Sequence, residues 1–164
     1  MDQFDLVIIG SGPGGYVGAI RAAQLGLKTA VIEKDKTLGG TCLNVGCIPS
    51  KALLQSSELY HEAKHDFGTH GIEIKDIKLN LDAMMTRKNK IVSDLTGGIE
   101  CLFKKNKITK IKGFGKITSA NTIEITSADG AKQTIQAKNI VIATGSVPVE
   151  LPFLKYDEKK IVSS

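Results

Sequence analysis

Residues 5–33, DLVIIGSGPGGYVGAIRAAQLGLKTAVIE, decide the fold of this chain. The stretch 5–10 is a short apolar run that ends in glycine, which is typical of a buried parallel strand. Small and apolar residues then recur at helical spacing over 14–26, and Gly26 is a suitable end for that helix. Residues 28–33 form a second apolar run. The order strand, helix, strand predicts a βαβ unit.

The turn between the first strand and the helix carries a glycine pattern, Gly10-x-Gly12-x-x-Gly15. The first glycine allows a tight turn, the second lets a pyrophosphate approach the backbone, and the third lets helix and strand pack closely. The helix N-terminus would offer N–H groups and partial positive charge to phosphates. Glu33 ends the second strand, 18 residues after Gly15, where a carboxylate binds ribose hydroxyls and disfavours a 2′-phosphate. The alternative is a glycine-rich turn beside a surface glutamate. The pattern favours the ADP half of a dinucleotide, without separating FAD from NAD.

The middle of the chain predicts loops and two long helices. Residues 37–48 are rich in Gly, Thr, Cys and Asn and show no periodicity. A helix is expected from Pro49, whose missing N–H costs nothing at a helix start, to about residue 63. A loop at 66–70 and a second helix at 81–105 follow, the latter interrupted by Gly97-Gly98. The apolar stripe of this second helix is Met84, Met85, Ile91, Leu95, Ile99, Leu102 and Phe103.

From Lys107 onward the hydrophobic period becomes two, which indicates strands. Short strands are expected around Ile117, 123–125 and Ile135, with turn residues between them, and together they predict a β-meander. Residues 139–145 then form another fully apolar strand that ends in glycine. The predicted fold is α/β: a doubly wound, Rossmann-like parallel sheet with an inserted helical hairpin and a three-stranded β-meander. The predicted domain covers 1–147, with the βαβ unit at 5–33, the cysteine segment and helices at 39–105, the strand and meander at 107–136, the last strand at 139–145, and a linker starting at 148–164.

Two cysteines with four residues between them precede the helix that Pro49 marks, in the segment Cys42-Leu-Asn-Val-Gly-Cys47-Ile-Pro-Ser-Lys51. Such a pair can close a small disulfide ring, and a thiolate at a helix N-terminus has a lowered pKa because the helix dipole stabilises it. Lys51 would lie on the same helical face as Cys47 and add positive charge. A zinc site, two inert thiols and a thioredoxin-like motif are the alternatives. Zinc lacks suitably spaced further ligands, and a redox-active disulfide fits best. Cys101 is expected to be a small buried hydrophobe without chemistry.

Composition excludes several classes of function. The 22 basic and 17 acidic residues give a net charge of +5, but the basic residues are scattered and aromatics make up only 5%. A nucleic-acid partner is therefore not expected. No stretch approaches the roughly 20 apolar residues of a membrane span. Because a strand follows Met1 almost at once, no presequence is expected. The location would be cytoplasmic, or the mitochondrial matrix if a presequence has been removed.

The glycine loop, the strand that ends at Glu33 and the cysteine block together resemble the pyridine nucleotide–disulfide oxidoreductase family, which includes glutathione reductase and mercuric reductase. The segment from Cys42 to Leu54 is most similar to the members that oxidise dihydrolipoamide. The resemblance covers essentially all 164 residues, and only about the first third of such an enzyme. It extends through Met84-Met85, Leu95-Thr96-Gly97-Gly98 and Gly113-Phe-Gly115-Lys116.

This resemblance implies the cofactor and the roles of individual residues. FAD would place its ADP half on the glycine loop, with Lys34 beside Glu33 at the ribose. Cys47 would face the flavin and form the charge-transfer thiolate, Cys42 would exchange with the substrate, and Lys51 would lie near flavin N5. Gly115 would approach the adenine. The implied catalytic residues are Cys42, Cys47 and Lys51, and the implied FAD-binding residues are Gly10, Gly12, Pro13, Gly14, Gly15, Glu33, Lys34, Gly39, Gly40, Thr41, Cys42, Cys47, Lys51, Gly115, Ala143, Thr144, Gly145 and Ser146; no metal is implied.

The implied reaction is the oxidation of a protein-bound dihydrolipoyl group through the disulfide and FAD, with NAD⁺ as acceptor. The implied partners are the lipoyl domains of 2-oxo acid dehydrogenase complexes or of the glycine cleavage system, and a second copy in a homodimer. A domain for NAD and an interface domain with a His–Glu base would lie outside this chain, and the three histidines present are assigned no catalytic role. The chain alone is expected to be inactive and to hold FAD weakly. Alternatives are a glutathione or mercuric reductase-like enzyme and a stand-alone flavin-binding module.

Overall fold

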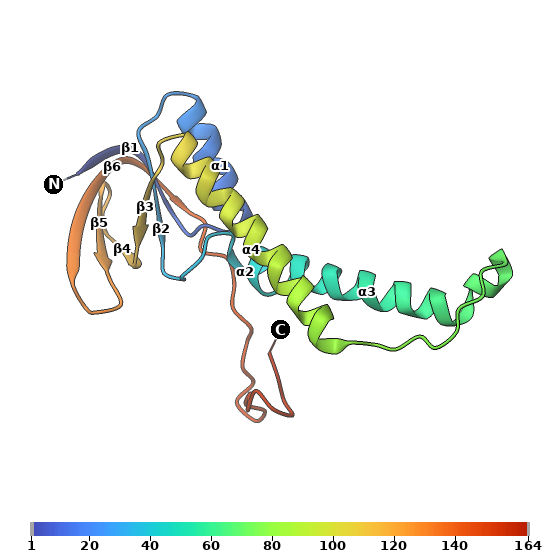
Figure 1. Cartoon of the computed structure of the whole chain (residues 1–164). Coiled ribbons are helices and arrows are strands. Elements are labelled where there is room, and N and C mark those ends of the chain that lie inside the picture. Colours follow the sequence, from blue (N-terminus) through green and yellow to red (C-terminus); the bar gives the residue numbers. More distant parts are fainter. Residues whose placement is uncertain (1, 164) are drawn as a thin grey trace.

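A computed structural model describes residues 2–163 of the chain. Within this part the chain folds as one six-stranded mixed sheet with helices on one side (Figure 1). The strand order is β3-β2-β1-β6-β5-β4. The strands are β1 (Gln3–Ile9), β2 (Thr29–Glu33), β3 (Thr109–Lys112), β4 (Phe114–Ser119), β5 (Thr122–Thr126) and β6 (Lys132–Ile142). The helices are α1 (Pro13–Gln24), α2 (Gly40–Asn44), α3 (Cys47–His65), the short 3₁₀ helix η1 (Phe67–His70) and α4 (Leu81–Lys105).

The predicted βαβ unit is confirmed as β1-α1-β2. The two strands pair in parallel, with Leu6 opposite Thr29 and Ile9 opposite Ile32. Helix α1 ends at Gln24, and Gly26 follows it with a left-handed φ of +87°, which a glycine adopts without strain. The predicted fold class, a Rossmann-like α/β domain, is therefore confirmed.

The prediction of two separate strands near Ile135 and at 139–145 is wrong, because one strand, β6, spans both. Its first half pairs antiparallel with β5, with Ile135 opposite Ile123. Its second half pairs in parallel with β1, with Ile142 opposite Ile9. The last residues of β6, Val141 and Ile142, are apolar but 42% and 68% exposed. One long strand thereby joins the meander to the parallel sheet.

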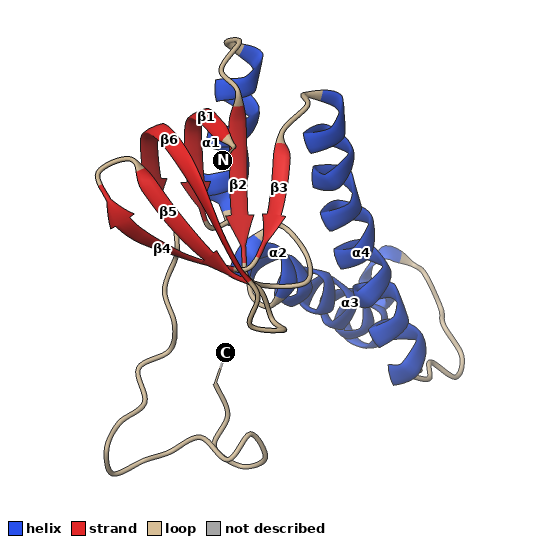
Figure 2. Cartoon of the chain, turned by 90° about the vertical axis from the view of Figure 1, so that its left-hand side faces the viewer, coloured by secondary structure: helices blue, strands red, loops and turns tan. Residues whose placement is uncertain are grey.

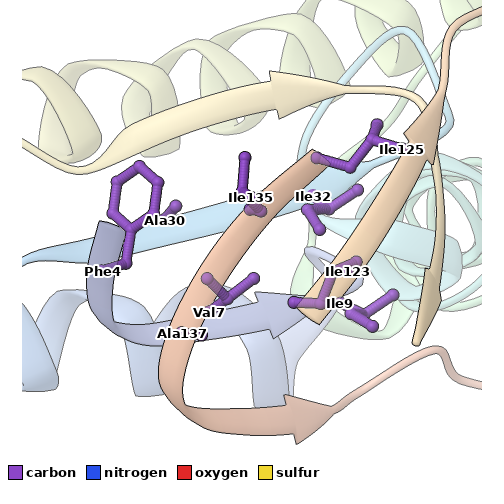
Figure 3. Close-up of a cluster of buried hydrophobic side chains, with 9 residues drawn as sticks. All are labelled: Phe4, Val7, Ile9, Ala30, Ile32, Ile123, Ile125, Ile135 and Ala137. Atoms are coloured by element: carbon purple, nitrogen blue, oxygen red, sulfur yellow. The ribbon is translucent and has the colours of Figure 1, made fainter. Parts of the chain in front are cut away.

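The meander folds over one face of the parallel strands and encloses the first hydrophobic core. Figure 3 shows the strands of the two parts around these side chains. β1 and β2 contribute the residues that point to this face. Strands β5 and β6 of the meander contribute three isoleucines and one alanine. The cluster consists of Phe4, Val7, Ile9, Ala30, Ile32, Ile123, Ile125, Ile135 and Ala137, each at most 8% exposed.

The opposite face of β1 and β2 is covered by helices and forms the second core (Figure 2). Because side chains alternate along a strand, Ile8 and Val31 point to this face between residues that point to the first. They pack with Ala19 of α1 and with Ile99 and Phe103 of α4. Burial on both faces explains the continuous apolar runs seen in the sequence.

Helices α3 and α4 form a hairpin that projects from the sheet (Figure 1). The glycine pair 97–98 does not interrupt α4, because both residues lie inside one continuous helix. The predicted loop at 66–70 forms η1 over Phe67–His70. Cys101, expected to be buried, is exposed, because α4 packs on the sheet along one side only. Within residues 2–163 no helix is both long and apolar enough to cross a membrane.

Candidate functional site

The first and third glycines of the loop after β1 are required by close backbone packing. A Cβ on Gly10 would lie 2.3 Å from the carbonyl oxygen of Ala143, and the φ of Gly10 is +99°. A Cβ on Gly15 would lie 2.0 Å from the carbonyl oxygen of Gly10. These separations are well inside van der Waals contact. The loop therefore forms only if both positions lack side chains.

Gly12, the second glycine of the pattern, is needed for a different reason. Within residues 2–163 no atom lies within 4 Å of a Cβ built on Gly12 or on Gly14. Gly12 is also the N-cap of α1, and no side chain of the described residues caps that helix end. The surface there is open, and the first-turn N–H groups are available to an anion such as a pyrophosphate.

Glu33, at the end of β2, is buried and held by three hydrogen bonds. The backbone N–H of Ser11 donates to its Oε2 at 2.9 Å, and the Ser11 hydroxyl donates to the same oxygen at 2.5 Å. The backbone N–H of Asp35 donates to Oε1 at 2.9 Å. Burial alone would raise the pKa of Glu33, but the N–H of Asp35 and both donors of Ser11 hold that pKa below its usual value. The carboxylate is therefore ionised at neutral pH.

The segment that carries the cysteines begins against the glycine loop. The backbone N–H of Gly39 donates to the carbonyl of Ser11 at 3.0 Å. A Cβ on Gly40 would lie 2.7 Å from the Cα of Gly12, so the two backbones touch. Gly39 and Gly40 also have left-handed φ values of +105° and +59°. The predicted nucleotide-binding segment and the predicted redox segment are therefore in direct backbone contact.

The two cysteines lie at consecutive helices and close to each other. Cys42 is half-buried in α2, and Cys47 is exposed and is the first residue of α3. The sequence placed residues 37–48 outside any helix and began the next one at Pro49. The structure instead has the short helix α2 there and starts α3 two residues earlier. Both sulfurs are free thiols in the described chain.

The pKa of the Cys42 thiol is raised, first because its side chain is hydrogen-bonded to Cys47, and also by desolvation and the charge of the Cys47 sulfur. Lys51 opposes this shift through its positive charge. Lys51 lies one turn after Cys47 in α3, as its spacing predicted. The three predicted catalytic residues therefore lie together.

Asn44, which lies between the cysteines, stabilises the loop by hydrogen bonds, a role that the sequence pattern did not predict. Its side-chain amide donates to the carbonyls of Leu38 at 3.1 Å and Gly40 at 2.9 Å. Its Oδ1 accepts from the hydroxyl of Thr37 at 2.7 Å. An asparagine in a Gly-rich segment is a frequent source of such local side-chain to backbone bonds, and this was the available signal.

The remaining predicted residues flank the glycine loop and the end of β2. Gly115 lies over the first core, where a Cβ would be 3.3 Å from Ile32. Lys34 lines a pocket of about 420 Å³ together with Lys112 and Phe114, two residues that the sequence did not single out. The predicted residues Thr144, Gly145 and Ser146 follow β6 without regular structure, and the N–H of Ala143 donates to the carbonyl of Ile9 at 2.8 Å.

The donor set suits the ADP half of a dinucleotide. The open backbone at Gly12 and Gly14 and the uncapped start of α1 offer N–H donors and space for a pyrophosphate. The ionised Glu33 offers an acceptor for ribose hydroxyls. No group of three or more His, Cys, Asp or Glu residues able to hold a metal occurs in residues 2–163.

Comparison with known proteins agrees with this site. The family described as "Pyridine nucleotide-disulphide oxidoreductase" matches residues 4–162. The chain is 59% identical over 163 residues, 99% of its length, to "Dihydrolipoyl dehydrogenase, mitochondrial" of Pisum sativum. It is 58% identical to "Leghemoglobin reductase" of Vigna unguiculata, also over 99% of its length, and 58% identical to "Dihydrolipoyl dehydrogenase, mitochondrial" of Homo sapiens over 98%. The match covers 31–32% of each relative, so the chain spans about a third of their length.

Proposed function

The chain belongs to the pyridine nucleotide–disulphide oxidoreductase family, and from this premise we propose that it is the FAD-binding and disulfide-bearing part of an enzyme that oxidises protein-bound dihydrolipoamide to lipoamide with NAD⁺ as acceptor. The observation that carries the proposal is that Cys42 in α2 and Cys47 at the start of α3 belong to a segment whose backbone touches the glycine loop at Gly40, next to the space that suits an ADP group. A stand-alone nucleotide-binding module would have no use for two adjacent thiols with Lys51 on the same helix.

FAD would be held by this chain's own backbone and by one carboxylate. The N–H groups at the start of α1 bind the pyrophosphate, and Glu33 accepts from the adenosine ribose. Lys34, Lys112 and Phe114 line the pocket beside the end of β2, where the adenine end of the cofactor would lie. When bound, FAD supplies an acceptor for the two electrons of the dithiol, which it can pass on as hydride.

The chemistry of the cysteines is thiol–disulfide exchange. With Cys42 and Cys47 oxidised, one thiolate of the dihydrolipoyl group attacks the Cys42 sulfur, and the Cys47 sulfur leaves as a thiolate. The second thiolate of the substrate then attacks the resulting mixed disulfide and releases Cys42. The substrate leaves as a cyclic disulfide after losing two electrons and two protons. The electrons stay on the sulfurs of Cys42 and Cys47, whose bond is broken, and one proton passes to Cys42 while the other is released.

The proton balance at the pair follows from its electrostatics. The pKa of the Cys42 thiol is raised, first by its hydrogen bond to Cys47, so the exchange thiol holds its proton more tightly than an isolated thiol does. The ammonium of Lys51 stabilises negative charge at the pair. The resemblance to the family assigns the charge-transfer thiolate to Cys47, which is the first residue of α3.

The proposals for the substrate, the partners and the location are based on the relatives and on the family resemblance, not on the structure of this chain. Relatives named for dihydrolipoamide and for leghemoglobin are nearly equal in identity to the chain. We favour dihydrolipoamide, with lipoyl domains of 2-oxo acid dehydrogenase complexes or of the glycine cleavage system as partners. We also propose a homodimer, and the mitochondrial matrix as location because dihydrolipoyl dehydrogenase relatives carry "mitochondrial" in their names.

The test is a substrate comparison in the intact protein. Reduction of NAD⁺ by dihydrolipoamide should exceed turnover with glutathione or mercuric ion. Cys42→Ser should lower the dihydrolipoamide rate by about 1,000-fold or more, because a hydroxyl can form neither the Cys42–Cys47 disulfide nor the mixed disulfide with the substrate. Cys101→Ser, an exposed cysteine on α4, is the matched control and should retain the rate. Preferred turnover of glutathione, or an active Cys42→Ser variant, would contradict the proposal.

A further inference from the structure

Ser11 lies between the first two glycines of the loop and is completely buried. It joins three parts of the site. Its N–H and hydroxyl both donate to Oε2 of Glu33, at 2.9 and 2.5 Å, and its carbonyl accepts from the N–H of Gly39 at 3.0 Å. One residue thus connects the glycine loop, the end of β2 and the start of the cysteine segment.

The carboxylate of Glu33 has limited capacity left for a ligand. An ionised carboxylate offers about four acceptor positions, two on each oxygen. Both positions on Oε2 are taken by Ser11, and one on Oε1 is taken by the N–H of Asp35. The backbone N–H of Lys34 also helps to lower the pKa of this carboxyl. It makes no hydrogen bond of normal geometry to Glu33, so within residues 2–163 the acceptor position left over by the three bonds is on Oε1.

Two of these three donors are backbone groups that any residue at their position would supply. The hydroxyl of Ser11 is the only side-chain donor to Glu33 among the described residues. Without it, Oε2 would keep a single donor, and the carboxylate could rotate about its last side-chain bond to seek another, because that torsion is soft. The hydroxyl therefore decides which oxygen of Glu33 stays available.

We propose that Ser11 is a positioning residue for the FAD adenosine: its hydroxyl orients the Glu33 carboxylate so that Oε1 accepts a ribose hydroxyl. This inference rests on the proposed function, because it takes FAD as the ligand. It also predicts that the contribution of Ser11 to affinity depends on the ribose hydroxyls and vanishes when the ligand lacks them.

The experiment uses the intact protein freed of FAD and two ligands: FAD, and an FAD analogue whose adenosine ribose is 2′,3′-dideoxy. Binding is followed by quenching of flavin fluorescence. In Ser11→Ala the affinity for FAD should fall by about 10-fold, since a hydrogen bond to a charged group is lost. The affinity for the dideoxy analogue should stay within about 2-fold of the unmodified protein.

A purely structural role for Ser11 would weaken both ligands equally, and that outcome, or no weakening of either, would overturn the proposal. Glu33→Gln supplies the coupling test: adding Ser11→Ala to it should cause little further loss of FAD affinity. If Ser11→Ala fails to fold, Ser11→Gly removes the same hydroxyl and keeps the backbone donor. If the unmodified protein binds neither ligand, the proposed function itself fails, which is a distinct result.

Discussion

The nucleotide-binding region and the redox region touch, yet they are built in opposite ways. At the glycine loop, backbone meets backbone, and Glu33 is buried with three donors. At the redox region, the sulfur of Cys42 in the middle of α2 is half-buried, and that of Cys47 at the start of α3 is exposed. The first region is therefore part of the fold itself, whereas the second consists of side chains placed on the fold. Mutations in the first region should act on stability, and mutations in the second should act on chemistry.

The two regions also shift acidity in opposite directions. The pKa of Glu33 is lowered because donors outweigh burial. The pKa of Cys42 is raised by its hydrogen bond to Cys47, desolvation and the charge on that sulfur. Glu33 in the nucleotide region therefore stays charged and can accept from a ligand, whereas Cys42 in the redox region holds its proton more tightly than a free thiol does. Three sets of substitutions sharpen this comparison.

The largest effect is expected within the glycine loop. Gly15→Ala places a methyl group 2.0 Å from a backbone oxygen and should lower the free energy of unfolding by about 3 kcal/mol or more. Gly12→Ala, its matched control, meets no described atom within 4 Å and should cost about 1 kcal/mol or less while weakening FAD binding strongly. Denaturant unfolding with and without FAD measures both. Equal loss of stability in the two variants would contradict the separate roles of these glycines.

A smaller effect is expected from truncating apolar side chains in the two regions. Ile32 is buried between β2 and the meander, and Ile32→Ala should cost about 2–5 kcal/mol. Leu54 on α3 is 64% exposed, and Leu54→Ala should change stability by only about 0.5 kcal/mol. Thermal unfolding compares the two. A cost at Leu54 similar to that at Ile32 would show that the projecting hairpin is as cooperative with the core as the sheet.

The smallest effect concerns acidity at the redox pair and should leave the fold intact. Cys47→Ala removes the hydrogen bond and charge that raise the pKa of Cys42, so the midpoint pH of Cys42 alkylation should fall. Lys51→Met removes a charge that lowers this pKa, so the midpoint should rise. Lys64→Met, near the end of α3, is the control and should leave the midpoint unchanged. Mass spectrometry of the Cys42 peptide after alkylation across a pH series measures each midpoint, and shifts of the opposite sign would refute this electrostatic account.

Most of the fold could be predicted because its signals are local. The apolar runs of β1 and β2, the helical spacing of α1 and the stop at Gly26 each involve residues close in the chain. The errors occurred where distant residues decide. β6 was divided because its polar stretch resembles a break, yet pairing with β5 and then β1 holds it as one strand. Cys101 was expected to be buried because a free cysteine without chemistry usually behaves as a small hydrophobe, but only one side of α4 faces the sheet.

The residues of the site fall into the same two groups: those predicted from local spacing and those that depend on distant contacts. Gly10, Gly12, Gly15 and Glu33 were found from spacing, since a phosphate-binding turn needs particular residues at fixed intervals. Ser11 and Asn44 were not found, because their roles depend on partners that the fold brings to them. The raised pKa of Cys42 was not predicted either, because it arises from the proximity of residues on two different helices.

By itself the sequence determined the βαβ unit, the glycine loop, the reactive cysteine segment and the family, because each depends on residue types at short, fixed spacing. Only the tertiary structure decided that the meander closes over the sheet, that the cysteine segment lies against Gly12, and that Ser11 holds Glu33. These depend on contacts between segments far apart in the chain, where packing and hydrogen bonding at short range select one arrangement that no local pattern encodes.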